Sequence, residues 1–541
     1  MTFSPDVPHP ARRDAMPLWV VLLLLAFLLW RIYTVVLAPL LVRHAPARAG
    51  HSAAAASGPD TASIEGVLST DLQAKLAFVA GLGHPGTVAQ ADPTSLRAAL
   101  KSAETFQKNS HNQPGAARRV ILLRAALGLP PFIVGKSGLD PRAAFTTALP
   151  AEVSPSEKAR YAAEGQLWTA AFSGGRLSPK QIAARSAQIS ALPTLRWWRY
   201  PALAALYSAQ GDKSEANRWT HQAQTRALPT LVPTIVLILL RGALFLLGLG
   251  LLFYLAVRAY QVRRATRSQS FQSVLPDLWP TLPPAIADSN RKLGAGDLMA
   301  VFVTYLLSRE VLTVVLTGLS LGPLHLGGLL TPYRSQIRAL SAADYATFNV
   351  VLESVTYLLS AAPPVLYLIT MARQRGASLA DEIGWNRRRF GSSLLFALGG
   401  FAIAQPLMIA TSLLGARALR NAPAPSNPVI PQLINAPGFW TPLLLIVLAS
   451  VAAPLVEELL FRGVFYNAVR PKLGPWPAII VTGLVFGFVH PVGVAEMLAI
   501  AMLGGVFAWM AETRRSMLPG IFAHGLNNLL TTLLLLFALA S

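Results

Sequence analysis

The sequence predicts an all-α, polytopic membrane protein: a bundle of about nine transmembrane helices with a helical domain inserted between spans one and two. Three observations support this fold class. The 541-residue chain is 53% hydrophobic and only 13% charged, which is too apolar for a soluble protein of this length. Several apolar runs of about 20 residues are long enough to cross a bilayer as helices. Lysines and arginines gather in alternate loops, as the positive-inside tendency predicts.

The N-terminal part divides into a span, a more polar domain and a second span. Residues 1–42 predict an uncleaved helix, at about 17–42, because the apolar residues continue without a small-residue cleavage site. Residues 43–229 contain no apolar run long enough to span and predict a helical domain. A second span is expected within 230–257, starting after two prolines. The arginines that follow it place its C-terminal end in the cytoplasm, so the 43–229 domain is expected to be extracytoplasmic.

The last part of this domain, Tyr200 to Ala223, predicts a helical hairpin. Apolar residues at helical spacing give each arm one apolar face, and Gly211-Asp212 makes the turn. The hairpin resembles one tetratricopeptide-like unit. A single copy is weak support, since such arrays need about three repeats, and plain helical packing is the alternative.

The remaining chain predicts a cytoplasmic linker and seven further spans. Residues 258–296 are basic and then proline-rich, 297–440 hold three spans, and 441–541 hold four. The expected spans are at about 297–321, 346–372, 391–416, 441–466, 477–493, 494–511 and 517–540.

Cysteine count and charge narrow the function further. The chain has no cysteine, which excludes disulfides, a thiol nucleophile and a thiolate metal site. The formal net charge is +21, but in a membrane protein Lys and Arg set the orientation of the spans. The charge therefore does not indicate nucleic acid, and none is expected as a partner.

A charged cluster lies inside the expected span 441–466. A charge at the bilayer centre costs roughly 2.5–3.5 kcal/mol on insertion scales, so such residues tend to be functional. Glu458 and Arg462 are four residues apart with the acid first, which favours an ion pair on one helix face. Glu457 is turned away from that pair by about a quarter turn and is left to face another group. The alternative is a charge cluster near the inner membrane boundary.

Two later spans each carry a histidine with a partner at helical spacing. Phe486 lies four residues before His490, and Asn528 lies four residues after His524, so each pair shares a helix face. A lone histidine in an apolar helix is usually satisfied by one hydrogen bond. In lipid every polar group needs a partner, and the economical solution is that these histidines meet Glu457.

Such a cluster has two chemical uses. A carboxylate with one or two imidazoles can take a proton from water, while His and Asn donors can stabilise the oxyanion of a tetrahedral intermediate. Alternatively, Glu457, His490 and His524 supply the three ligands of an open zinc site with water in the fourth place. Both routes lead to hydrolysis of an acyl bond, with a peptide as the expected substrate.

Three motifs in order carry a resemblance to a known family. They are Glu457-Glu458-x-x-x-Arg462, Phe486-x-x-x-His490 and His524-x-x-x-Asn528. Together they resemble the CPBP family, which includes the type II CAAX prenyl endopeptidases and bacterial bacteriocin-processing or immunity proteins. The resemblance covers roughly residues 440–535.

The resemblance implies a role for each motif. Glu457 and His490 would act on the catalytic water, His524 and Asn528 would hold the oxyanion, and the neighbouring Glu–Arg pair would be structural. It leaves open whether a divalent metal such as Zn²⁺ or a glutamate-activated water is used. The expected protein is thus an intramembrane endopeptidase of a bacterial inner membrane, acting on a membrane-associated peptide or protein.

Other classes remain as alternatives. A non-catalytic immunity or scaffold protein would bind a partner through the extracytoplasmic domain. A transporter would use Arg309, Glu310 and Glu353, although interfacial pairing and snorkelling are the preferred explanation of these charges. Gly294-Ala295-Gly296-Asp297 has the pattern of aspartyl intramembrane proteases, but Asp297 starts a span and fits a helix N-cap, and no later span holds a second aspartate.

Overall fold

The computed structural model describes residues 64–539 with gaps. The residues not described within that range are 82–90, 110–111, 134–137, 148, 150–154, 173, 193–194, 266–291, 322–323, 386–389, 419–431, 434–437, 491 and 493. The span expected at 17–42 and most of the expected linker lie outside the described residues. The described chain separates into two compact units, one mainly within Ala49–Leu239 and one formed by Leu240–Pro425 with Asn435–Thr532.

The first unit, here called the helical unit, is built from short helices over its described residues. They are α3 Ile64–Ala80, α4 Pro93–Asn109, α5 Pro114–Ala126, η5 Ala143–Phe145, α6 Pro155–Phe172, α7 Pro179–Ala191, η6 Arg196–Trp198, α8 Arg199–Ala209 and the first part of α9 Lys213–Ala265. Proline opens α4 to α7, because its fixed φ suits the first turn, where the N–H has no helical acceptor. Ser178 also caps α7, where its side chain and that of Gln181 each accept from the other's backbone N–H.

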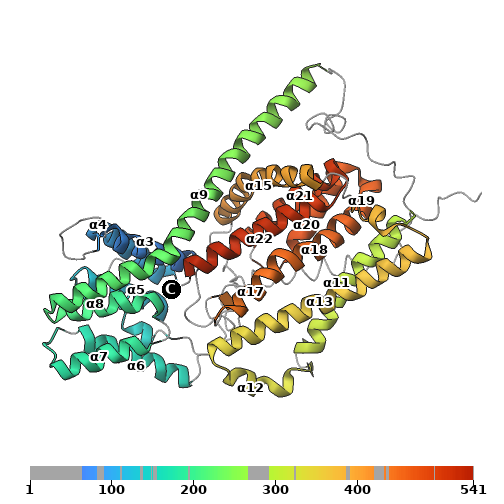
Figure 1. The fold of residues 1–541 in the computed structure, drawn as a ribbon. Helices are drawn as coiled ribbons and strands as arrows, with labels where there is room; N and C mark the ends of the chain where they lie inside the picture. Colours follow the sequence, from blue (N-terminus) through green and yellow to red (C-terminus); the bar gives the residue numbers. More distant parts are fainter. Residues whose placement is uncertain are drawn as a thin grey trace, which may run out of the picture. The chain divides into compact units, whose positions relative to one another are not determined.

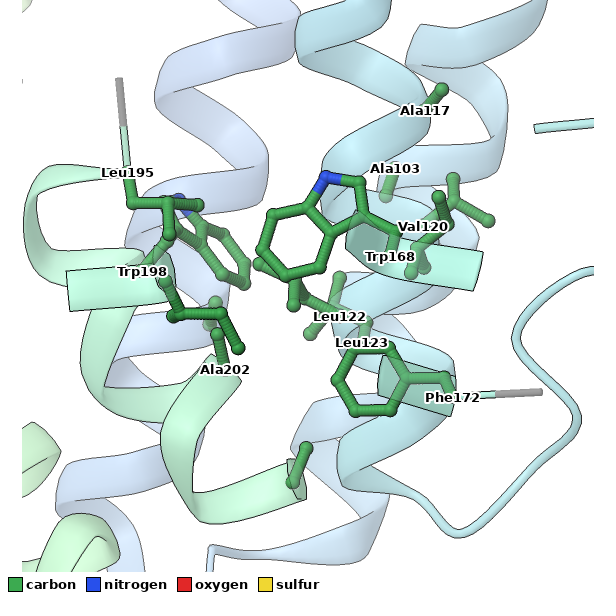
Figure 2. Close-up of a cluster of buried hydrophobic side chains, with 14 of the residues drawn as sticks. Ala103, Ala117, Val120, Leu122, Leu123, Trp168, Phe172, Leu195, Trp198 and Ala202 are labelled. Atoms are coloured by element: carbon green, nitrogen blue, oxygen red, sulfur yellow. The ribbon is translucent and has the colours of Figure 1, made fainter. Parts of the chain in front are cut away.

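The core of the helical unit lies around α5 and α6 (Figure 2). The rings of Trp168 and Phe172 stack with centroids 6.2 Å apart. Arg118 and Glu164 are buried in the same region and pair through two hydrogen bonds of 2.6 and 2.9 Å. The Trp168 indole N–H donates to Glu164 at 3.0 Å. The buried carboxylate is therefore held by three donors, as a charge removed from water requires.

The expected hairpin over Tyr200–Ala223 is confirmed. α8 ends at Ala209 and α9 begins at Lys213. Gly211 lies in the turn with φ of +80°, a left-handed conformation that glycine adopts without steric cost. Tyr200 and Trp219 contact each other across the two arms, with ring centroids 6.3 Å apart.

Helix α9 belongs to both units. It runs without interruption over Lys213–Ala265 (Figure 1). Ala227 and Leu231, in its first part, are buried. The sequence places the start of the second span after Pro229 and Pro233, whereas the helix passes through both prolines. An internal proline removes one helical hydrogen bond and crowds the preceding turn, and here the apolar residues on either side continue the helix.

The second unit, here called the membrane unit, contains the apolar helices. Its elements are the rest of α9, then α11 Ala295–Thr317, β1 Gly318–Leu321, β2 Leu324–Gly327, η8 Thr331–Tyr333, α12 Arg334–Ala339, α13 Ala342–Gln374, α14 Leu379–Glu382, α15 Phe390–Ala418, α17 Trp440–Val447, η9 Leu448–Ala452, α18 Ala453–Glu458, η10 Leu459–Phe465, α19 Tyr466–Leu473, α20 Pro475–Phe488, α21 Val494–Arg514 and α22 Leu518–Leu539.

Seven helices among the described residues are long and apolar enough to cross a membrane, and α20 is apolar but shorter. The chain is an integral membrane protein. The all-α polytopic fold class is confirmed, and the total of about nine spans stays a prediction because the first lies outside the described residues.

Three local predictions differ from the structure. The span expected at 297–321 ends as a helix at Thr317, and a short antiparallel hairpin of β1 and β2 follows. The span expected at 477–493 ends as a helix at Phe488. Asp297 is not an N-cap: Gly294 holds that position, and the Asp297 carboxylate accepts from the Gly294 N–H at 3.1 Å. The carboxylate satisfies one of the N–H groups that a helix start leaves unpaired.

Candidate active site

The two glutamates lie in a helix with unusual backbone on both sides. α18 is flanked by two π-helical segments, η9 and η10. A π turn inserts an extra residue into a helix and changes the direction of the side chains that follow, and such turns are frequent at functional sites. The expected single span 441–466 is therefore a composite helix that changes its winding on each side of Glu457 and Glu458.

Glu458 and Arg462 form a fully buried ion pair. Arg462 Nη1 lies 2.7 Å from Glu458 Oε1, and neither side chain has exposed surface. Arg462 Nη2 donates to the carbonyl oxygen of Gly504 on α21 at 2.7 Å. The guanidinium also lies 4.5 Å from the ring centroid of Phe486 and 5.1 Å from that of Phe507. The pair therefore connects η10 to α20 and α21 through charge, a backbone bond and cation–π contacts.

Glu458 also orients a histidine on α22. Its Oε1 atom lies 3.1 Å from His524 Nδ1, and the His524 ring stacks on Phe507 with centroids 5.3 Å apart. The Glu458 carboxylate is an acceptor, so His524 Nδ1 carries the proton of this bond. The bond fixes the ring so that the other nitrogen, Nε2, lies 3.8 Å from Glu457 Oε2. A carboxylate that sets the tautomer of a functional histidine is a common supporting arrangement.

His490, just beyond the end of α20, also approaches Glu457. Its Nδ1 atom lies 2.7 Å from the carbonyl oxygen of Phe486. Because a carbonyl only accepts, Nδ1 is the protonated nitrogen of the neutral ring and Nε2 carries the lone pair. His490 Nε2 lies 3.8 Å from Glu457 Oε2. The ring packs against Phe486 with centroids 4.8 Å apart.

Small residues allow α20 to approach α21 closely, which positions His490. A Cβ at Gly483 would lie 2.6 Å from the carbonyl oxygen of Ala501, and one at Gly487 would lie 2.6 Å from that of Met497. Small residues that bring helix backbones together are typical of membrane interfaces. Any larger side chain at these two glycines would push the two helices apart.

Glu457 is the point at which these groups converge. Its Oε2 atom is buried, makes no hydrogen bond with the described residues, and lies 3.8 Å from Nε2 of His490 and 3.8 Å from Nε2 of His524. The side chains of Glu457 and His490 keep 13% and 26% of their surface exposed, whereas that of His524 keeps 5%. The cluster is thus open on the side of His490 and closed on the side of His524.

Asn528 lies one turn from His524 but is engaged elsewhere. Its Nδ2 atom donates to the carbonyl oxygen of Ala449 in η9 at 2.8 Å, and its Oδ1 atom accepts from Asn527 Nδ2 at 3.2 Å. Since an amide nitrogen has two hydrogens, one is used by Ala449 and the other can serve a ligand. No contact between Asn528 and Glu457 is recorded among the described residues.

Sequence reasoning missed one neighbour of Glu457. The hydroxyl of Tyr357, on α13, lies 3.5 Å from Glu457 Oε1 and 3.3 Å from the carbonyl oxygen of Ala453. A tyrosine in an apolar helix gives no signal of its own, because such residues are usual in membrane helices. Arg309, on α11, interacts with the neighbouring Tyr305 hydroxyl.

The same residues offer the donor types of a metal site. One carboxylate oxygen and two imidazole Nε2 atoms are the donor types that zinc prefers, and Glu457 Oε2 lies 3.8 Å from each Nε2 atom. However, the described residues contain no group of three His, Asp or Glu arranged closely enough to hold a metal ion. Metal binding by Glu457, His490 and His524 remains a prediction.

Comparison with known proteins identifies the class of this region. Residues 439–530 match the family described as "Type II CAAX prenyl endopeptidase Rce1-like". This segment contains every motif on which the sequence resemblance rests. The resemblance to the CPBP family is therefore confirmed for residues 439–530.

A particular relative gives the same result. Over 86 residues the chain is 33% identical to a Bacillus subtilis (strain 168) protein described as "Putative membrane peptidase YdiL". The match covers 16% of this chain and 34% of the relative, so it spans about a third of that protein's length. No solved structure matches the chain significantly. The family match, over 439–530, does not include the helical unit.

Proposed function

We propose that the protein is an intramembrane endopeptidase that hydrolyses a peptide bond at the cluster of Glu457, His490 and His524. One observation carries the proposal: the Glu457 oxygen that has no hydrogen bond among the described residues lies 3.8 Å from Nε2 of both His490 and His524. A buried carboxylate needs a polar partner, and a water molecule bound between these groups would supply it. The same water is then positioned as a nucleophile.

The reaction follows general acid–base catalysis. The carboxylate of Glu457 takes a proton from the water as the water oxygen attacks the carbonyl carbon of the substrate. A tetrahedral intermediate forms with its negative charge on the former carbonyl oxygen. The proton then passes from Glu457 to the leaving amide nitrogen, the C–N bond breaks, and the products are a carboxylic acid and an amine. His490 holds the water through its Nε2 lone pair.

The oxyanion is assigned to the α22 side of the cluster. Asn528 offers its second Nδ2 hydrogen as a donor. His524 can donate through Nε2 only when both ring nitrogens are protonated, and the ring then lies as a cation beside the carboxylates of Glu457 and Glu458. Donors fixed in a site that excludes bulk water stabilise a developing oxyanion strongly, because they need no reorganisation.

The donor types of Glu457, His490 and His524 suit a divalent metal, but the three side chains would have to move closer together to hold one. If zinc binds, Glu457, His490 and His524 would hold it, and it would supply an acidified water and polarise the substrate carbonyl. The protein residues would still align the substrate and exclude bulk water.

The proposed substrate is a membrane-associated peptide or protein of a bacterial inner membrane. The cluster lies among helices that cross the membrane, so a substrate has to reach it from the lipid or from the membrane surface. Prenylation is suggested by the family's name alone, so the proposal does not include it.

The test uses the full-length protein and its inactive variant Glu457→Gln, each expressed in a strain of the source organism that lacks the gene. New peptide termini in the membrane fraction are quantified by mass spectrometry. We expect a set of termini that appears with the wild-type protein and disappears with Glu457→Gln. The uncleaved precursors should co-purify with the variant.

Glu496→Gln is the matched control, because Glu496 is an exposed carboxylate in the same domain. It should generate the same termini as the wild-type protein. Termini that persist in the Glu457→Gln strain would refute the proposal. A binding or scaffold function would instead be indicated by a phenotype that follows removal of the helical unit and ignores Glu457→Gln.

A further inference from the structure

An arginine interrupts the apolar stretch of α9. Between Pro229 and Val257, Arg241 is the only charged residue in the sequence. A charged side chain within a membrane span is costly and normally faces a protein interior, where it has polar partners. Arg241 follows this rule, and its partners lie on α22, the helix that carries His524 and Asn528.

The contacts of Arg241 are specific. Its Nη2 atom lies 2.7 Å from the Thr531 hydroxyl oxygen and 3.4 Å from Asn527 Oδ1. Thr531 in turn donates to the carbonyl oxygen of Asn527 at 2.7 Å, so its lone pairs remain available to the guanidinium. Asn527 is buried, with 8% of its surface exposed.

These contacts fix the orientation of the Asn527 side-chain amide and, through it, that of the Asn528 side-chain amide. An arginine only donates, so the atom of Asn527 that faces it is the oxygen, which turns the Asn527 nitrogen toward its neighbour. Asn527 Nδ2 then donates to Asn528 Oδ1 at 3.2 Å. With its oxygen held there, Asn528 presents Nδ2 to the carbonyl oxygen of Ala449 at 2.8 Å and keeps a second hydrogen for another acceptor.

We propose that Arg241 is a positioning residue for the oxyanion site. It acts through Asn527 to hold the Asn528 oxygen, which leaves the second hydrogen of the Asn528 nitrogen available as the oxyanion donor. The inference rests on the proposed function and extends it to a residue outside the segment 439–530 that matches the protease family. If the Asn528 amide were flipped, its oxygen would lie where the oxyanion develops, and the two oxygens would repel each other.

The kinetic test compares variants on a substrate peptide that spans a Glu457-dependent cleavage site. Loss of one oxyanion donor lowers kcat by about 10²–10³, and we expect that loss for Asn528→Ala. Arg241→Met keeps the apolar stem and should lower kcat about tenfold at unchanged KM, because the donor is present but no longer oriented. Asn527→Asp keeps the contact with Arg241 but cannot donate to Asn528, and should match Arg241→Met. Arg241→Lys should restore part of the rate.

Arg241→Met and Asn528→Ala form a double-mutant cycle, and Arg258→Met is the matched control. Arg241→Met should add nothing to Asn528→Ala, since both act on one donor. Arg258→Met, at an exposed position on the same helix, should retain the wild-type kcat. A tenfold loss with Arg241→Met that adds fully to Asn528→Ala, or an unchanged kcat with Arg241→Met, would overturn the inference.

The position of Arg241 beside Thr531 can be tested without measuring cleavage. The chain has no cysteine, so Arg241→Cys/Thr531→Cys can be linked in membranes with a short bis-maleimide and detected by a gel shift. Cross-linking is expected for this pair and not for Arg258→Cys/Thr531→Cys. Absence of the first cross-link would refute the contact itself. Cleavage that persists in Glu457→Gln would instead refute the proposed function and leave the contact intact.

Discussion

Removal of Arg462 is the sharpest test of how the site is held together. Arg462→Met keeps the length of the side chain but removes two hydrogen bonds of 2.7 Å, one to Glu458 and one to the carbonyl oxygen of Gly504. The Glu458 side chain, with no exposed surface, then keeps its charge without its cation. Removing one partner of a buried pair costs about 3–5 kcal/mol, and we expect a loss of that size in the free energy of unfolding.

The double variant Glu458→Met/Arg462→Met separates stability from catalysis. Replacing both members of a buried ion pair by apolar residues of similar volume is often neutral or stabilising. The double variant should therefore regain most of the stability lost by Arg462→Met. It should remain inactive, since His524 has lost the acceptor that holds its ring.

Unfolding is measured in mixed micelles by titration with sodium dodecyl sulfate and read out by far-UV circular dichroism, and cleavage is measured on the same samples. Arg515→Met is the control, because Arg515 is 38% exposed and its pair with Glu512 belongs to the class worth about 0–1 kcal/mol. If Arg462→Met were as stable as Arg515→Met, or if the double variant cleaved at the wild-type rate, the structural role assigned to the pair would be wrong.

Three further perturbations probe other contacts. Tyr357→Phe removes the hydroxyl 3.5 Å from Glu457 and should lower the cleavage rate about two- to tenfold, as expected for loss of one neutral hydrogen bond. Gly520→Ala places a methyl group against Glu458 Oε2, and such overpacking should cost about 1–3 kcal/mol in the micelle unfolding assay. Trp168→Ala opens the core of the helical unit and should cost about 3–5 kcal/mol, measured by thermal unfolding of that unit.

Each of these has an outcome that contradicts it. An unaltered cleavage rate with Tyr357→Phe would remove this tyrosine from the site. A Gly520→Ala protein of wild-type stability would mean that Glu458 has room to move. If the helical unit with Trp168→Ala unfolded at the same temperature as the wild-type unit, the core drawn in Figure 2 would not be what stabilises the helical unit.

Helical spacing in the sequence predicts the contacts within one helix. Glu458 and Arg462 are four residues apart, and that spacing alone predicts the pair, which lies at 2.7 Å. The same argument places Phe486 beside His490, where the ring centroids lie 4.8 Å apart. Convergence of the two histidines on Glu457 followed from the rule that polar groups in lipid need partners.

The contacts between helices were beyond the reach of spacing rules. Tyr357 and Arg241 lie 100 and 286 residues from their partners Glu457 and Asn527, and helical periodicity says nothing about such pairs. Arg241 did carry a signal, as a lone charge in an apolar stretch. The end of α20 at Phe488 was hidden because apolar residues continue past it, so hydropathy extended the expected span through His490.

The continuous helix α9 has a practical consequence for dissecting this protein. A chain cut after Pro229, where composition changes, would lose the Thr230 hydroxyl to which Lys75 donates at 3.1 Å, and would lose Leu231, which is 2% exposed. The excised N-terminal piece would therefore fray at its own core. A soluble form of the helical unit has to retain at least another turn of α9. It also needs fewer exposed apolar side chains on that helix, for instance by replacement of Val232 and Val236 with glutamate.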